Sequence, residues 1–137
     1  MGMKVMICYD GSSSAQKALE KSIEYFKHKN PEIILLTVVE RPLDASLENE
    51  TIFEKWHQER HKELKKATSF ITDHGLEVDA ILAVGDPRKM ILELIDKKSP
   101  DIVVVSRRGK TEMEKMLLGS VSAFLVRHST SPMLIMT

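Results

Sequence analysis

Two glycine-containing segments near the end of the chain carry residue types suited to holding an anion. Ser106-Arg107-Arg108-Gly109 and Gly119-Ser120-Val121-Ser122 are separated by nine residues. Glycine permits close backbone approach, and a helix capped by Ser120 would offer unpaired N–H groups and the positive end of its dipole. The hydroxyls of Ser120 and Ser122 can donate to phosphate oxygens. We therefore predict that these segments form a phosphate-binding loop.

Positive charge in this loop is local, because the chain as a whole is neutral. Its 137 residues include twenty Lys and Arg and twenty Asp and Glu, so the formal net charge is zero. This balance argues against a broad basic surface for nucleic acid. Arg107, Arg108 and Lys110 nevertheless lie together. We expect them to serve one small anionic ligand.

Alternating apolar and polar segments predict the elements that position this loop. Apolar runs indicate strands over Lys4–Tyr9, Glu32–Val39, Leu76–Val84, Ile102–Val105 and Met133–Met136. Helical periodicity fills the intervals, and the second helix is marked by residues from Phe53 to Ile71. Strands that are apolar on both faces and alternate with helices predict an α/β fold, with one open five-stranded parallel sheet and helices on both faces.

The loops after the first and fourth strands are the places to search for a ligand site. In open parallel sheets, ligands bind beyond the carboxyl ends of the strands where the strand order reverses. These two loops begin at Asp10 and Ser106. Asp10 has two interpretations, since an Asp before Gly-Ser also commonly satisfies turn amides or caps the next helix.

Three other catalytic motifs are incomplete. Gly109-Lys110-Thr111 resembles the end of a Walker A loop, but a valine stands where that motif needs its earlier glycine. His57 and His61 have metal-ligand spacing, yet Gln58 replaces the glutamate of a zincin. Ser120 lacks the second glycine of a nucleophile elbow. We therefore predict no catalytic residue and no protein-bound metal from these motifs.

The order of motifs along the chain resembles the universal stress protein family. That family's fingerprint is Gly, two residues, Gly, nine residues, then Gly-Ser or Gly-Thr, and this chain follows the spacing. Matching segments elsewhere are Tyr9-Asp10-Gly11-Ser12, Thr37-Val38-Val39-Glu40, Gly85-Asp86-Pro87 and Pro132-Met133-Leu134-Ile135. The resemblance implies a single domain over residues 1–137, a Rossmann-like sheet of order 3-2-1-4-5, and a role in stress response or signalling.

The resemblance extends to the branch of the family that binds ATP. It implies that Cys8, Tyr9 and Asp10 line the nucleotide beside the first strand, with Asp10 near the ribose and phosphates, with or without Mg²⁺. Val38 would contact the adenine. The remaining implied contacts come from Ser106, Arg107, Arg108, Gly109, Gly119, Ser120, Val121 and Ser122.

Ser106 departs from the ATP-binding pattern, which has a glycine at this position. A side chain here hinders close backbone approach and access to positive φ. The leading hypothesis is an ATP-binding protein with at most slow hydrolysis, because no dedicated general base is recognisable. The alternative is a dimeric interaction module without nucleotide. An adenylating enzyme ranks third, because the loop from Asp10 to Ser14 holds one glycine.

The last strand and the single cysteine bear on assembly and compartment. Met133–Met136 is apolar, and exposed sheet edges tend to be covered; the resemblance implies a homodimer through this strand. No apolar run approaches the roughly 20 residues that span a bilayer, and the first residues lack a secretory signal. We therefore expect a cytoplasmic protein with no membrane partner. Cys8 cannot form an internal disulfide and otherwise suits a small core residue.

Overall fold

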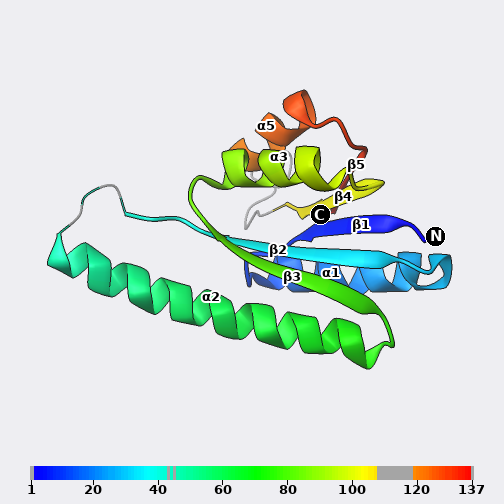
Figure 1. The fold of residues 1–137 in the computed structure, drawn as a ribbon, viewed down its shortest axis with the longest axis horizontal. Helices are drawn as coiled ribbons and strands as arrows, with labels where there is room; N and C mark the ends of the chain where they lie inside the picture. Colours follow the sequence, from blue (N-terminus) through cyan, green and yellow to red (C-terminus); the bar gives the residue numbers. More distant parts are fainter. Residues whose placement is uncertain (1, 43, 45, 108–118, 137) are drawn as a thin grey trace.

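Five parallel strands form one sheet in the computed structural model, which describes residues 2–42, 44, 46–107 and 119–136. The strands are β1 (Lys4–Cys8), β2 (Glu32–Val39), β3 (Glu77–Val84), β4 (Ile102–Ser106) and β5 (Met133–Met136). Their order is β3-β2-β1-β4-β5, with parallel pairing throughout. This confirms the predicted fold class and strand order. The order reverses between β1 and β4, which are neighbours in the sheet (Figure 1).

Helices cover both faces of the sheet. They are α1 (Ser13–Phe26), the short 3₁₀ helix η1 (Lys27–Lys29), α2 (Leu47–Asp73), α3 (Pro87–Lys98) and α5 (Ser120–His128). In Figure 1, α1 and α2 lie on one side of the sheet and α3 and α5 on the other. Within the part of the chain that the structure describes, no helix has both the length and the apolar character needed to cross a membrane.

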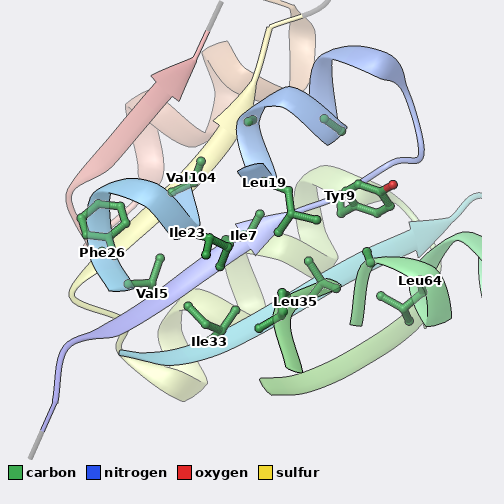
Figure 2. Close-up of a cluster of buried hydrophobic side chains, with 14 residues drawn as sticks. Val5, Ile7, Tyr9, Leu19, Ile23, Phe26, Ile33, Leu35, Leu64 and Val104 are labelled. Carbon is green, nitrogen blue, oxygen red and sulfur yellow. The ribbon is translucent and has the colours of Figure 1, made fainter. Parts of the chain in front are cut away.

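Alternation along the strands divides the core into two clusters. Val5 and Ile7 of β1 face α1 and α2, where Figure 2 shows them beside Leu19 and Ile23 of α1. Met6, between them in sequence, faces α3 and α5. Because both faces bury apolar side chains, the central strands are apolar at nearly every position, as the sequence predicted.

The helix that follows β1 begins in a tightly bonded turn. Gly11 adopts a φ of +80°, which a side chain would disfavour. The Asp10 carboxylate accepts a hydrogen bond from the Ser12 backbone N–H at 2.9 Å, and Ser12 Oγ accepts one from the Ala15 N–H at 3.1 Å. The N-cap of α1 is therefore Ser12, and Asp10 holds the turn before it.

The second helix begins earlier than its apolar pattern predicts. The periodic residues start at Phe53, but α2 begins at Leu47, because Ser46 Oγ accepts a hydrogen bond from the Asn49 N–H at 3.1 Å. A capping serine thus extends the helix by more than a turn through polar sequence. These added residues carry α2 beyond the sheet on the side where the strands end (Figure 1).

Candidate functional site

A pocket of about 540 Å³ lies at the carboxyl ends of the central strands. It has the size and position expected of a ligand site in an open parallel sheet. Five groups of described residues line it: Cys8, Tyr9 and Asp10 at the end of β1 and just after it; Leu36, Val38, Val39 and Glu40 along β2 and just after it; Trp56 and Arg60 on α2; Pro87 and Ile91 on α3; and Val105, Ser106, Gly119, Ser120, Val121 and Ser122 at β4 and the start of α5.

Tyr9, the first residue after β1, is held by two hydrogen bonds of its hydroxyl and carbonyl. Its hydroxyl donates a hydrogen bond to Gln16 Oε1 at 2.9 Å, and its carbonyl accepts one from Thr37 Oγ1 at 2.8 Å. Burial, and then the nearby charges of Glu63, Asp10 and Glu20, raise the pKa of the Tyr9 phenol. Tyr9 therefore stays a neutral hydrogen-bond donor and acts as part of the wall.

Cys8 and Asp10 lie on either side of Tyr9 in sequence and both line the pocket. Burial first, and then the Asp10 charge, raises the pKa of the Cys8 thiol from 9.0 to about 12. The thiol is therefore protonated at neutral pH and is a weak nucleophile. Asp10 makes the turn contact that one interpretation predicts, because its carboxylate accepts the Ser12 N–H, and it also lines the pocket. Its contact with a ligand stays a prediction.

The β2 and α3 side of the pocket is largely apolar. Val38 lines this side and packs against the core cluster beneath α3 and α5. Pro87 and Ile91 lie in the first turns of α3, which Asp86 caps by accepting a hydrogen bond from the Arg88 N–H at 3.0 Å. A flat apolar group fits this side better than a charged one.

The start of α5 forms another part of the pocket wall. Its N-cap is Gly119, not Ser120 as the sequence predicted, and a glycine supplies no capping oxygen for the first turn. Backbone N–H groups at such an end are donors for an anion. Ser120 and Ser122 both line the pocket, and Ser122 is buried.

Ser106 ends β4 without backbone strain. Among the described residues other than glycine, only Asn30 and Ser99 have positive φ, so Ser106 has negative φ. The position pairs with Met136 in the sheet, where a side chain is accommodated in regular extended backbone. The replacement of the motif glycine by serine thus costs no conformational strain at this residue.

Of the basic residues that were predicted to contact the ligand, the structure describes Arg107, and this residue does not line the pocket. Arg107 donates its backbone N–H to the Met136 carbonyl at 2.7 Å. Arg108, Gly109 and Lys110, which were also predicted to belong to this loop, lie outside the described residues. The remaining predicted residues, from Cys8 to Ser122, meet around the one pocket.

Sequence reasoning missed the contribution of α2. Trp56 and Arg60 line the pocket from this helix, and Glu40 lines it from the chain leaving β2. A signal was present, because Trp56 and Arg60 continue the helical stripe that includes Leu64. No known motif marks that stripe as part of a site.

Within the described part of the chain, no three His, Cys, Asp or Glu side chains are grouped as metal ligands would be. Asp10 and Glu40 are the carboxylates that line the pocket there. The described lining combines an apolar side, hydroxyls and a helix N-terminus, which are groups suited to a ligand with an apolar part and an anionic part.

Comparisons with known proteins agree with this geometry. The chain is 29% identical over 136 residues to universal stress protein MJ0531 of Methanocaldococcus jannaschii, covering 96% of this chain and 80% of that protein. The solved structure of MJ0577, from the same organism, superposes with a TM-score of 0.87 at 27% identity, covering 99% and 96% of the two chains.

A second solved structure carries a ligand. A universal stress protein family protein from Arabidopsis thaliana, with AMP bound, superposes with a TM-score of 0.71 at 27% identity, covering 98% of this chain and 90% of that one. The model of the universal stress protein family matches residues 1–137. With the motif spacing, the strand order and the match over its whole length in agreement, this chain belongs to the universal stress protein family.

Proposed function

We propose that this protein binds an adenine nucleotide, with ATP as the favoured ligand, in the pocket at the carboxyl ends of β1, β2 and β4. The observation that carries the proposal is the pairing, in one pocket of about 540 Å³, of an apolar side with an uncapped helix N-terminus. The AMP-bound relative from Arabidopsis thaliana supports the same ligand class. In this proposal, residues 1–137 act as one cytoplasmic stress-response domain.

The two sides of the pocket suit the two ends of a nucleotide. Val38, Pro87 and Ile91 offer an apolar slot for a base. Ser120, Ser122 and the backbone at the start of α5 offer donors for phosphate oxygens. Asp10, which also lines the pocket, is the carboxylate that we assign to the ribose or to a phosphate-bound Mg²⁺.

Slow hydrolysis is the most that we assign to this site. Phosphoryl transfer depends on a positioned nucleophile and concentrated charge at the γ-phosphate. Cys8 is protonated at neutral pH, and Asp10 is engaged in the turn before α1. Binding and release of nucleotide, rather than rapid turnover, is therefore the proposed activity.

The proposed assembly is a homodimer through β5. This strand is an edge of the sheet, and all four of its residues are only half buried. Apolar edge strands are normally covered, and a two-fold pairing of the same strand covers both copies at once.

The direct test is titration of the wild-type protein with Mg-ATP. Trp56 is the single tryptophan of the chain, lines the pocket and is 42% exposed, so nucleotide binding should change its emission. Calorimetry on the same samples measures affinity independently of that signal. We expect saturable binding, and mass spectrometry of the denatured purified protein should detect copurified adenine nucleotide.

Failure to bind nucleotide at millimolar concentration would contradict the proposal. Ser106→Gly is the matched variant, because it restores the family glycine without altering another lining residue. The unstrained backbone at Ser106 leads us to expect similar affinity in both proteins. Binding only by the variant would instead identify the natural protein as the nucleotide-free interaction module.

A further inference from the structure

The positively charged side chain in the described pocket lining is Arg60, which comes from α2 and not from the predicted loop after β4. Among the lining residues that the structure describes, Asp10 and Glu40 are acidic, and Arg60 is the only Lys or Arg. Arg107 is not part of that lining, and Arg108 lies outside the described residues. A polyphosphate bound beside two carboxylates requires compensating positive charge. The described lining supplies it from α2.

Core packing determines which face of α2 meets the pocket. The side chains of α2 that are buried against the sheet are Leu64, Ala67 and Ile71. Figure 2 shows Leu64 on the same side of this cluster as Tyr9. Arg60 lies one turn before Leu64 and therefore on the same face. Where the sheet ends, that face continues over the pocket instead of over the core.

Two contacts keep this part of α2 beside the strand ends. The Glu63 carboxylate lies so close to Gly11 that a Cβ on the glycine would overlap it. Nearer the start of α2, the Arg41 guanidinium lies 4.3 Å from the centre of the Phe53 ring. The first contact joins α2 to the loop after β1, and the second joins it to the chain leaving β2.

The Arg60 side chain is held at the pocket wall without being enclosed. Its Nη1 donates to the Glu63 carboxylate, and 31% of the side chain is exposed. A guanidinium carries five N–H donors in a planar fork. The bond to Glu63 therefore orients the group while further donors remain able to meet a phosphate.

We propose that Arg60 is a phosphate-binding residue of this pocket, so that α2 contributes the guanidinium that meets the phosphates of the bound nucleotide. This inference rests on the proposed function and deepens it. It predicts that the contribution of Arg60 grows with the number of phosphates on the ligand. An ordinary surface ion pair between Arg60 and Glu63 would show no such dependence.

The experiment compares Arg60→Gln with Lys62→Gln by calorimetry, using adenosine, AMP and Mg-ATP. Lys62 lies on the same helix, is exposed and does not line the pocket, so its variant removes the same charge elsewhere. We expect Arg60→Gln to weaken ATP binding about tenfold or more, to weaken AMP binding less, and to leave adenosine binding within about twofold. Lys62→Gln should stay within about twofold for all three ligands.

Arg60→Lys is the second variant, and circular dichroism checks that every variant is folded. Lysine keeps the charge but lacks the planar fork, so its ATP affinity should lie between those of the wild type and Arg60→Gln. If the wild type binds ATP and Arg60→Gln binds it equally well, or loses adenosine and ATP affinity alike, the inference is wrong and the proposed function stands. If the wild type binds no nucleotide, both are refuted.

Discussion

Cys8 and Ser106 show how the surroundings of a residue change its chemical character. A cysteine in a ligand pocket suggests reactivity, yet burial raises the pKa of this thiol to about 12 and keeps it protonated. A serine in place of a motif glycine suggests strain, yet Ser106 has negative φ at the end of β4. The raised pKa of Cys8 agrees with the small core residue that the sequence suggested, whereas the strain expected from a serine at position 106 is absent.

The Cys8 thiol should therefore alkylate slowly in the folded protein. At pH 8 a thiol with a pKa of 9.0 is about one-tenth ionised, whereas one with a pKa of about 12 is ionised in roughly one molecule in ten thousand. We expect the native protein to react with iodoacetamide at least about a hundredfold more slowly than the urea-unfolded chain. Mass spectrometry of timed samples measures both rates.

The raised pKa of the Cys8 thiol also makes the free energy of unfolding depend on pH. The unfolded chain releases the thiol proton first, so the Cys8 contribution to the free energy of unfolding falls as pH rises from about 9 toward 12. Similar alkylation rates in the folded and unfolded proteins at pH 8 would contradict the raised pKa.

At the scale of elements, α2 has two parts with different tasks. The part that carries Leu64, Ala67 and Ile71 packs against the sheet and holds the helix in place. The part that precedes it projects beyond the sheet, and from it Trp56 and Arg60 line the pocket. One amphipathic stripe therefore serves as core in one half and as pocket wall in the other.

Two isoleucine-to-alanine substitutions in α2 should separate these tasks. Ile71 is 0% exposed and Ile52 is 36% exposed. Ile71→Ala opens a cavity in the core, so we expect it to lower the free energy of unfolding by about 2–5 kcal/mol. Ile52→Ala leaves no enclosed cavity and should change it by less than about 0.5 kcal/mol. Urea denaturation measures both, and equal losses would contradict this division of α2.

For the whole molecule, a net charge of zero conceals an uneven local distribution. Twenty basic and twenty acidic groups cancel over the chain, while the described pocket lining contains Asp10, Glu40 and Arg60. A small polyphosphate can be held by such a site together with the N-terminus of α5, whereas an extended nucleic acid would need a broad basic face.

The proposed dimer is tested on the whole molecule. Light scattering of the wild-type protein should give twice the 15.6 kDa mass of one chain. Leu134→Glu places a charge in the middle of β5, so we expect it to shift the mass toward that of one chain. Circular dichroism must show an intact fold in the variant, because Leu134 also packs against the core. A monomeric wild type would refute the dimer.

Much of the fold was predictable because its determinants are local in sequence. Apolar runs at Ile33–Leu36 and Ile102–Val105 predict buried strands, and Asp86-Pro87 predicts a helix start. The two-sided apolar character of the strands predicts helices on both faces. The resemblance to the universal stress protein family implied the strand order and most of the residues that meet around the pocket.

Tertiary structure decided what no local pattern encodes. That Arg60, rather than Arg107, lines the pocket depends on where α2 crosses the strand ends, and core packing at Ile71 and Leu64 sets that crossing. That Ser106 lies in regular paired strand, opposite Met136 of β5, is likewise a contact between distant segments. Periodicity and turn chemistry act within a few residues, so they predicted the helices and strands, and the α/β alternation predicted the carboxyl ends of the strands as the place to look for a site. Contacts between segments far apart in the chain decided which side chains line the pocket.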